Sequence, residues 1–464
     1  MSYPSSDLVI DPVLIRKYDV SGPRYTSYPT ADRFTGAFDE AAYRQALRAR
    51  NPAGAQQPLS LYAHVPFCRN VCFYCACNKV VTRDAARARR YVDQIATEIA
   101  MTAGLLGGRR QVRQVHWGGG TPTFLGEEGM QALCAAIDAH FERVPGSECS
   151  IEVDPREAGP GTMAFLADLG FNRVSFGVQD FDPAVQAAVN RIQPEALTRD
   201  VVAQARATGF RSINLDLIYG LPKQTLDSFS VTLDKVLELD PDRIALYAYA
   251  HLPGRFKPQR RIAAADLPTA EARLQIMTLA IGRLTRAGYH YIGMDHFAKP
   301  GDDLAAAQAQ GRLHRNFQGY STLPEGDMLG FGVSAIGRVG TAYVQNEKVL
   351  EGYGAAVQAN RLPAATGFLM GRDDLLRRAV IQALMCQFRL SIEAVEAAHL
   401  VDFHEYFGPE LALLRRLEDE GLVQVDRDWI VVTPVGRLLV RAVCMVFDRY
   451  LREARSRAGY SRVL

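Results

Sequence analysis

Short apolar or β-branched runs alternate with stretches of helical periodicity from residue 59 to about residue 300. This alternation predicts consecutive βα units and therefore a parallel sheet. The predicted strands are 59–66, 112–117, 149–153, 173–178, 212–219 and 243–249. The predicted helices between them include 84–103, 127–143, 195–208 and 225–239. About six such units can be counted, which favours an α/β fold with a partial (β/α)6 barrel of the TIM type over a closed eight-fold barrel.

The flanking regions differ in character from this core. Residues 1–58 contain a Pro-rich segment at 23–30, which is predicted to be an extended arm. Residues 300–360 are Gly-rich and irregular, and such a segment between regular elements is often functional. Helical periodicity returns at 373–386, 393–398, 408–420 and 433–454, with a predicted hairpin at 422–432. We therefore expect three parts: an N-terminal arm (1–58), a barrel with a substrate-facing loop (59–365) and a C-terminal helical, winged-helix-like domain (366–464).

The composition narrows the class of protein. The chain has 464 residues, a net charge of +2 and 48% hydrophobic residues, which is ordinary for a globular protein and gives no reason to expect a nucleic-acid partner. No apolar stretch approaches the roughly 18 residues that a membrane span needs. The N-terminus lacks the basic and apolar regions of a secretory signal. These features predict a cytoplasmic protein without a membrane span.

Four of the eight cysteines fall within ten residues, at Cys68, Cys72, Cys75 and Cys77. The first three have the spacing C-x3-C-x2-C, and thiolates are soft ligands suited to iron or zinc. A tight loop of this kind can place three sulfurs on one face of a cubane cluster. Three protein ligands leave one iron open to bind and activate another molecule. The other four cysteines are scattered in apolar or helical surroundings and are expected to be small buried hydrophobes.

Two other interpretations of the cysteine cluster stay open at this point. All four thiols could hold a structural zinc ion, although zinc sites usually pair C-x2-C units that are further apart. A disulfide pair is disfavoured in a reducing compartment.

A glycine triplet, Gly118 to Gly120, follows the second predicted strand and precedes Thr121. Glycine lets the backbone approach a ligand closely, although a glycine triplet is often no more than a turn. Polar residues stand at the ends of other strands or shortly after them, where a βα barrel builds its site: Glu152, Gln179, Asp180 and Arg191. Asp216 lies inside an apolar run, where a lone carboxylate needs either a function or a structural partner.

The cysteine spacing directly after the first predicted strand resembles the signature of the radical S-adenosylmethionine (SAM) superfamily. Longer stretches resemble one family within it, the oxygen-independent coproporphyrinogen III oxidases, also called coproporphyrinogen dehydrogenases. These stretches are 62–68, 75–79, 116–123, 151–156, 177–181 and 216–224, together with 23–30 and 314–320 outside the superfamily core. The resemblance covers about residues 20 to 464.

The resemblance implies a partial barrel with a C-terminal helical domain, a [4Fe-4S] cluster on Cys68, Cys72 and Cys75, and two SAM molecules. It implies that the first SAM is lined by Tyr62, Gly119, Glu152 and Ile336. It implies that the second is lined by Tyr74, Gly120, Thr121, Gln179, Arg191, Asp216 and Ala250. Cys77 belongs to the family motif without being an expected iron ligand.

The implied reaction is the oxidative decarboxylation of two propionate side chains of coproporphyrinogen III to vinyl groups, through a 5′-deoxyadenosyl radical made from SAM. The product would be protoporphyrinogen IX, a step of haem biosynthesis. A substrate with four carboxylates should contact arginine or lysine side chains, and Arg24 and Arg315 are candidates, although ordinary surface charge explains them as well. We expect a monomer, while the electron donor and acceptor stay open.

Three rival functions follow from the same residues. A haem chaperone on the radical SAM scaffold is one, although such relatives tend to lack the 23–30 and 314–320 segments. Another tetrapyrrole-modifying or methyl-transferring radical SAM enzyme is the second. The structural zinc protein is the third.

Overall fold

The computed structural model describes residues 8–50, 57–323, 326–453, 460 and 462, which divide into two compact units. The barrel unit contains residues 34–276 and 326–369, and the helical unit contains the described parts of 1–33, 277–325 and 370–464. The division into arm, barrel and C-terminal domain drawn from the sequence stays a prediction.

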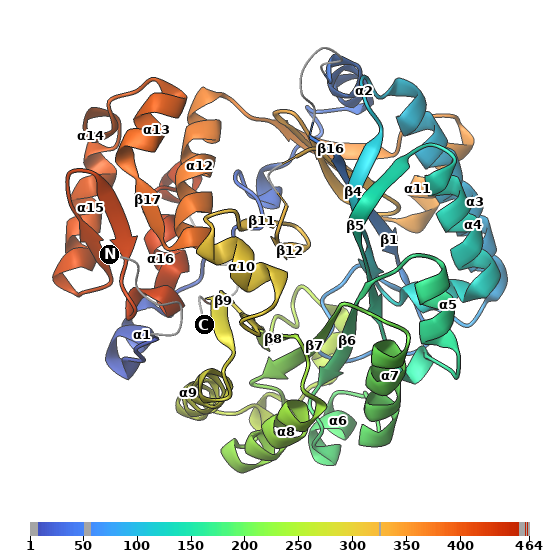
Figure 1. The fold of residues 1–464 in the computed structure, drawn as a ribbon, viewed down its shortest axis with the longest axis horizontal. Coiled ribbons are helices and arrows are strands. Elements are labelled where there is room, and N and C mark those ends of the chain that lie inside the picture. The colour runs from blue at the N-terminus through green and yellow to red at the C-terminus, as the bar shows by residue number, and fades with distance from the viewer. Residues whose placement is uncertain (1–7, 51–56, 324–325, 454–459, 461, 463–464) are drawn as a thin grey trace. The chain divides into compact units, whose positions relative to one another are not determined.

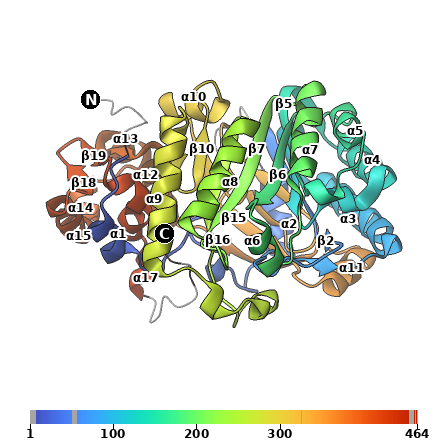
Figure 2. The ribbon, with the colours of Figure 1, turned by 90° about the horizontal axis from the view of Figure 1, so that it is seen from below.

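Six parallel strands pair side by side in the barrel unit, in the order β1-β4-β5-β6-β7-β8. The strands are β1 (Leu59–Val65), β4 (Gln111–Gly119), β5 (Glu142–Val153), β6 (Arg173–Gln179), β7 (Ser212–Tyr219) and β8 (Arg243–Ala248). The connecting helices are α3 (Ala85–Leu105), α4 (Gly126–Asp138), α5 (Thr162–Asp168), α6 (Pro183–Ala188), α7 (Glu195–Ala207) and α8 (Leu226–Leu239). Figures 1 and 2 show these helices outside the strands. The predicted partial barrel is confirmed.

Strand β7 shows the two-residue period of a pleated sheet in the burial of its side chains. In β7, Ile213, Leu215 and Leu217 are buried, whereas the intervening Asn214 and Asp216 are only partly buried. The apolar side packs under amphipathic helices such as α8, which starts at a capping box formed by Thr225 and Ser228. The other side of β7 therefore carries the polar groups Asn214 and Asp216.

The helix predicted at 127–143 is shorter than expected, because α4 ends at Asp138 and β5 already begins at Glu142. Glu142 pairs with Gln111 of β4, so residues 142 and 143 belong to the sheet although they continue the helical pattern.

The prediction of an irregular segment at 300–360 is wrong in both halves, because the first half contains α10 (Asp303–Ala309) and the hairpin of β11 (His314–Asn316) and β12 (Gly319–Ser321). Residues 328–369 form β13 (Met328–Phe331), β14 (Ile336–Val339), β15 (Ala342–Asn346), α11 (Leu350–Gln358) and β16 (Ala364–Leu369). β13 extends the parallel sheet beside β1, and the other three strands continue it in antiparallel order. Glycines obscured this pattern: a Cβ atom on Gly330 would lie 2.5 Å from the Ile336 carbonyl oxygen, so only glycine fits there. The remaining barrel-unit helix, α2 (Glu40–Ala49), precedes β1.

The C-terminal part of the helical unit combines helices with a small antiparallel sheet in the order β17-β19-β18. Its elements are α12 (Arg372–Gln387), β17 (Arg389–Ser391), α13 (Ile392–His399), α14 (Phe403–Tyr406), α15 (Gly408–Asp419), β18 (Val423–Val425), β19 (Trp429–Val432), α16 (Val440–Met445) and α17 (Arg449–Glu453). The hairpin predicted at 422–432 is confirmed.

The single helix predicted at 433–454 is wrong within its described part, 433–453. A 3₁₀ turn (Gly436–Leu439) precedes α16, and the chain breaks again before α17. Asp448 causes the second break, because its carboxylate accepts hydrogen bonds from the backbone N–H groups of Tyr450 and Leu451 and so starts a new helix.

The rest of the helical unit comes from earlier parts of the chain. It holds α1 (Pro12–Tyr18), the hairpin of β9 (His290–Gly293) and β10 (His296–Ala298), α10 (Asp303–Ala309), and the hairpin of β11 (His314–Asn316) and β12 (Gly319–Ser321). The chain passes from one unit to the other within α9 (Ala270–Arg286). Residues 23–30 form neither helix nor strand, as predicted, and Arg441 holds the start of this segment by donating to the Pro23 carbonyl at 2.8 Å.

Candidate active site

The clustered cysteines lie in a loop that leaves the sheet after β1. The loop starts at the two-residue strand β2 (Phe67–Cys68) and returns at β3 (Val80–Val81), which pairs with β2 in parallel. Two backbone hydrogen bonds close its base, from Val80 to the Pro66 carbonyl at 2.7 Å and from Thr82 to the Cys68 carbonyl at 3.0 Å. All four cysteines are free thiols. One closed loop therefore carries the three sulfurs of the C-x3-C-x2-C pattern.

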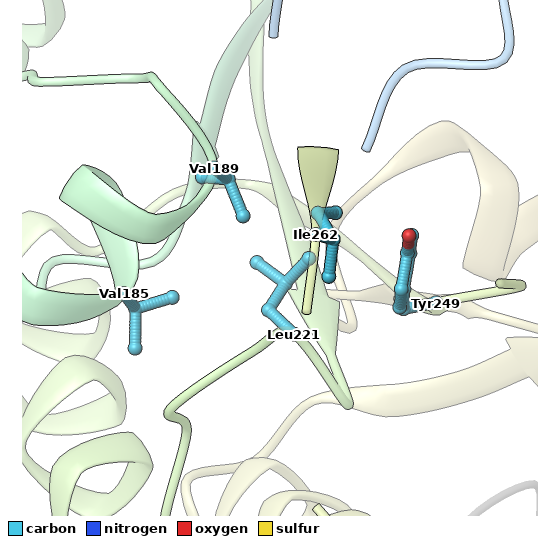
Figure 3. Packing of buried hydrophobic residues seen from close by; sticks show 5 residues of the cluster. All are labelled: Val185, Val189, Leu221, Tyr249 and Ile262. Carbon is cyan, nitrogen blue, oxygen red and sulfur yellow. The ribbon is translucent and has the colours of Figure 1, made fainter. Parts of the chain in front are cut away.

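A buried hydrophobic cluster supports this loop. Figure 3 shows its five residues, which come from α6 and the residue after it, from the segments after β7 and β8, and from the turn that follows residues 257–261: Val185, Val189, Leu221, Tyr249 and Ile262. Phe73 and Tyr74 of the loop pack against the cluster.

Backbone contacts fix the loop to the same segments. Phe73 donates its N–H to the Val189 carbonyl at 2.9 Å. Gln259 donates its amide to the Tyr74 carbonyl at 2.9 Å and to the Ala250 carbonyl at 3.1 Å. The position of the thiols is therefore set by packing and by hydrogen bonds from the barrel.

Each of the three motif thiols has a hydrogen-bond donor. The Thr121 hydroxyl lies 3.7 Å from Cys68 Sγ. Arg156 and Arg191 approach Cys72 Sγ at 3.5 and 3.6 Å. The Cys77 thiol and the Lys79 side chain are the donors at Cys75. Hydrogen-bond donors around sulfur are typical of cysteines that ligate iron.

The pKa values of these thiols diverge with their surroundings. Burial raises the pKa of Cys68 to about 11. Cys77 lowers the pKa of Cys75, with Lys79 adding to the effect, and in return the Cys75 sulfur raises the pKa of Cys77.

Asp154 joins the two arginines at Cys72. Its carboxylate accepts from Arg156 Nη2 at 2.6 Å and from Arg191 Nη1 at 3.0 Å. Burial raises the pKa of Asp154, but the charges of Arg191 and Arg156 outweigh it and lower the pKa to about 2. Arg191 also donates to the Gly177 carbonyl at 2.6 Å, while its buried Nε has no partner.

The glycine triplet at the end of β4 lies against the start of the cysteine loop. A Cβ atom on Gly120 would lie 2.6 Å from the Phe67 carbonyl oxygen, and one on Gly119 would lie 2.5 Å from the His64 ring. Gly119 also has a φ of +116°, in the region that favours glycine. His64 in turn contacts the Tyr62 hydroxyl through Nδ1 at 2.9 Å. Glycine is therefore required here by close approach and by backbone conformation.

Glu152 of β5 faces this strand end. One of its oxygens accepts the Gly119 N–H at 3.1 Å, and the other lies 3.5 Å from His116 Nε2. Desolvation inside the barrel raises the pKa of Glu152, but the hydrogen bond and charge of His116 and the Gly119 N–H outweigh it, so the net pKa lies below the ordinary value. Glu152 is therefore a fixed negative charge.

The pKa of Asp216, on β7, is shifted in the opposite direction from that of Glu152. Its carboxylate accepts from the Ser175 hydroxyl at 3.0 Å and from the Asn214 amide at 2.8 Å. Desolvation and the charge of Glu152 raise its pKa to about 7, in spite of those hydrogen bonds. This lone carboxylate thus has structural partners and also titrates near neutrality.

The candidate residues lie on or just after strands of the sheet, and β13 separates the strand of Ile336 from that of Tyr62. In sheet order they are Ile336 at the start of β14, Tyr62 within β1, Gly119 at the end of β4 with Gly120 and Thr121 after it, Glu152 on β5, Gln179 at the end of β6, Asp216 within β7 and Ala250 after β8. Tyr74 lies in the cysteine loop, and Arg191 lies in the loop between α6 and α7. The carboxyl ends of the six parallel strands share one edge, so most of the predicted residues are brought together there.

Two predictions concern residues elsewhere. Asp180, another polar strand-end residue, has a structural role: it accepts from Thr232 at 2.7 Å and Gln224 at 2.6 Å. Arg24 and Arg315 belong to the helical unit, where Arg24 pairs with Asp295 and Arg315 donates to the Arg24 carbonyl at 3.4 Å.

Sequence reasoning did not single out His64, His116 and Arg156 as site residues. The signal that could have found the two histidines is the two-residue period of a strand. His64 stands two residues from Tyr62, and His116 stands two residues from Gly118, hence on the same side of their strands.

The residues fit an iron–sulfur cluster with SAM beside it: three loop thiols with donors, glycines where a Cβ would collide, and an unpartnered Nε on Arg191. Among the described residues, no group of three or more His, Cys, Asp or Glu side chains is arranged to hold a single metal ion. Helices long and apolar enough to cross a membrane are also absent from the described part of the chain.

Comparison with known proteins first defines the class. Residues 62–236 match the Radical SAM superfamily, and residues 371–439 match the HemN C-terminal domain. With the partial barrel, these matches make the chain a radical SAM protein, and that class implies SAM and an iron–sulfur cluster as cofactors.

The chain is 49% identical to oxygen-independent coproporphyrinogen III oxidase of Pseudomonas aeruginosa over 98% of both chains, and 48% identical to that of Escherichia coli K12, again over 98% of both. The solved structure of coproporphyrinogen III oxidase (HemN) from Escherichia coli, described as a radical SAM enzyme, matches with a TM-score of 0.91 and 47% identity, over 96% of this chain and all of that one. The chain therefore belongs to the oxygen-independent coproporphyrinogen III oxidase family of radical SAM enzymes.

Proposed function

We propose that this chain converts coproporphyrinogen III to protoporphyrinogen IX by oxidative decarboxylation of the ring A and ring B propionates. It would do so in the cytoplasm, as a monomer, with a [4Fe-4S] cluster and two SAM molecules. The observation that carries the proposal is the closed loop of Cys68, Cys72 and Cys75 at the carboxyl edge of the barrel, with a donor at each sulfur. When bound, the cluster and SAM would supply the one-electron chemistry that removes a hydrogen atom from the propionate.

The chain's own residues would bind and orient the cofactors. Cys68, Cys72 and Cys75 would each ligate an iron and leave a fourth iron open for the amino and carboxylate groups of SAM. Tyr62, Gly119, Glu152 and Ile336 would line the SAM at the cluster. The fixed negative charge of Glu152 suits the ammonium group of SAM.

A second set would line the other SAM: Tyr74, Gly120, Thr121, Gln179, Arg191, Asp216 and Ala250. The support is that Arg191 keeps a buried, unpartnered Nε, to which a carboxylate can bind. Asp216 is a carboxylate of the kind that accepts hydrogen bonds from ribose hydroxyls. In the helical unit, Arg24 and Arg315 are the proposed contacts for substrate carboxylates.

The test is anaerobic turnover of the full chain, reconstituted with iron and sulfide and supplied with SAM, a reductant, an electron acceptor and coproporphyrinogen III. Chromatography with mass detection would measure 5′-deoxyadenosine and the porphyrin products. We expect both deoxyadenosine and protoporphyrin, with a loss of at least a hundredfold in Cys68→Ala and little change in Cys134→Ala, a free thiol outside the loop. Deoxyadenosine without decarboxylated product, or haem binding without turnover, would contradict the proposal.

A further inference from the structure

Two guanidinium groups converge on the sulfur of one proposed cluster ligand. Arg156 Nη2 lies 3.5 Å from Cys72 Sγ, and Arg191 Nη1 lies 3.6 Å from it. Both distances suit N–H···S hydrogen bonds. Cys68, by contrast, receives the neutral hydroxyl of Thr121 at 3.7 Å. The donors are therefore unequal, and Cys72 receives charged ones.

Asp154 fixes the geometry of both arginines. Besides the contacts of its Oδ2 atom, its Oδ1 atom accepts from Arg156 Nε and from the Arg156 backbone N–H, each at 3.0 Å. Arg156 is thus bound to one carboxylate through two side-chain N–H groups and its backbone N–H. Such a fork leaves the guanidinium little freedom to turn away from the sulfur.

Arg156, Arg191 and Asp154 together carry a net positive charge, and their side chains are largely shielded from solvent. Two guanidinium groups and one carboxylate sum to one positive charge. The side chains of Arg156, Asp154 and Arg191 are only 17%, 12% and 7% exposed. Water screens such a charge less than an exposed one, so it acts on the neighbouring sulfur more strongly than a surface charge would.

We propose that Arg156, held by Asp154, is a positioning residue that raises the reduction potential of the cluster through its hydrogen bond to Cys72 Sγ. The inference rests on the proposed function, because it requires the cluster on Cys68, Cys72 and Cys75. Reduction transfers one electron from an external donor to the cluster and neither makes nor breaks a bond. The added negative charge spreads onto the thiolates, and hydrogen bonds and positive charge at the sulfur stabilise the reduced form. Arg191 has a second proposed role toward SAM, so Arg156 is the residue that isolates the effect.

The experiment is a redox titration of the reconstituted full chain without SAM, using dithionite and mediators, with the reduced cluster measured by electron paramagnetic resonance. At the potential where the native cluster is half reduced, we expect Arg156→Gln to lower the ratio of reduced to oxidised cluster at least tenfold, which is 59 mV for one electron. The matched control is Arg69→Gln. Arg69 follows Cys68 in the chain, pairs with Glu157 at 2.6 Å and is half exposed, so its loss removes the same charge near another ligand. The control ratio should stay within twofold of the native one.

Iron and sulfide content separate the possible outcomes. An Arg156→Gln chain with a full cluster and an unchanged or higher ratio would overturn the inference. Failure of that variant to load a cluster would also overturn it, because Arg156 would then be needed for assembly rather than for the potential. A shift of equal size in Arg69→Gln would assign the effect to net charge and overturn the role of the hydrogen bond. A native chain that loads no [4Fe-4S] cluster would overturn the proposed function and this inference with it.

Discussion

The imidazole of His116 lies 3.5 Å from one carboxylate oxygen of Glu152, and the other oxygen accepts a hydrogen bond from the Gly119 N–H at 3.1 Å. His116 is itself held by the Ser150 hydroxyl, 2.6 Å from its Nδ1, and its ring stacks on that of Tyr62. Each oxygen of the carboxylate is thus held by a group of the neighbouring strand β4. A carboxylate held in this way is pre-organised to receive a cationic group.

Replacing Glu152 by Gln should weaken SAM binding to the cluster-loaded chain about tenfold. The change removes the negative charge but keeps the shape, so a charge-assisted hydrogen bond becomes a neutral one. Equilibrium dialysis with labelled SAM would measure the dissociation constant. The matched control is Glu148→Gln on the same strand, where the carboxylate pairs with Arg173 at 3.0 Å rather than with the glycine triplet. Equal affinity in the Glu152 variant and the native chain would contradict the assignment of Glu152.

SAM affinity should also rise with pH through about 7. The folded chain without SAM holds Asp216 with a pKa of about 7, so the group is mostly neutral at pH 6 and charged at pH 8. The charged form is the better acceptor for ribose hydroxyls, so binding should favour it. We expect the affinity to increase about threefold from pH 6 to pH 8 in the native chain.

The matched variant for this pH effect is Asp216→Asn, which keeps the hydrogen-bonding shape without the titration. Ser175, Asn214, Glu152 and Arg191 all act on this carboxylate, and all stay in place in the variant. Its affinity should vary less with pH than that of the native chain. An identical pH profile in both chains would rule out Asp216 as the titrating group.

The barrel could be predicted because the signals for its strands and helices lie in short, contiguous stretches of the sequence. Each of the six strands is an apolar run bounded by turn residues, and each predicted helix has its own periodicity, with a capping side chain at the start of α3 and α8. The strands β13 to β16 could not be predicted, because Gly330 and Gly337 interrupt their pattern for a reason that lies in a neighbouring strand. The break before α17 was missed for a similar reason, since Asp448 looks like an ordinary helix residue until its carboxylate caps the next turn.

The candidate site was predictable to the extent that it follows motifs. The C-x3-C-x2-C loop and the glycine triplet are contiguous in sequence, and the structure places them in contact. The arginine pair at Cys72 is different, because Arg156 and Arg191 lie 84 and 119 residues from that cysteine. Such a pairing depends on the closure of the barrel, and no local pattern encodes it.

Leu221→Ala should lower the free energy of unfolding of the barrel unit by about 2–5 kcal/mol. Leu221 is fully buried in the hydrophobic cluster of Figure 3, against which Phe73 and Tyr74 of the cysteine loop pack. Loss of its side chain leaves a cavity beneath the loop, so we also expect less iron per chain after reconstitution. Thermal unfolding with iron analysis would measure both effects. Leu226→Ala is the control, because Leu226 is 40% exposed at the start of α8 and its truncation should cost less than about 0.5 kcal/mol.

Glu98 should make the barrel unit less stable as the pH rises from about 4.5 to 7. It is 2% exposed on α3, where it accepts from the Gly332 N–H at 2.8 Å, the Asn346 amide at 2.6 Å and the Tyr353 hydroxyl at 2.7 Å. Burial raises its pKa to about 7 in spite of these donors. The folded chain therefore keeps the proton up to about pH 7, whereas the unfolded chain releases it near 4.5, so ionisation favours unfolding across that window.

The expected loss is up to about 3 kcal/mol between pH 4.5 and 7, with no further change from this group above that range. Other groups titrate over the same range, so the measurement is the difference in thermal stability between the native chain and Glu98→Gln at a series of pH values. The Gln variant keeps the shape and cannot ionise. Its stability relative to the native chain should rise from pH 5 to pH 7.5 and then level off. A constant difference across the series would mean that Glu98 is already ionised in the folded chain, with Gly332, Asn346 and Tyr353 compensating fully for its burial.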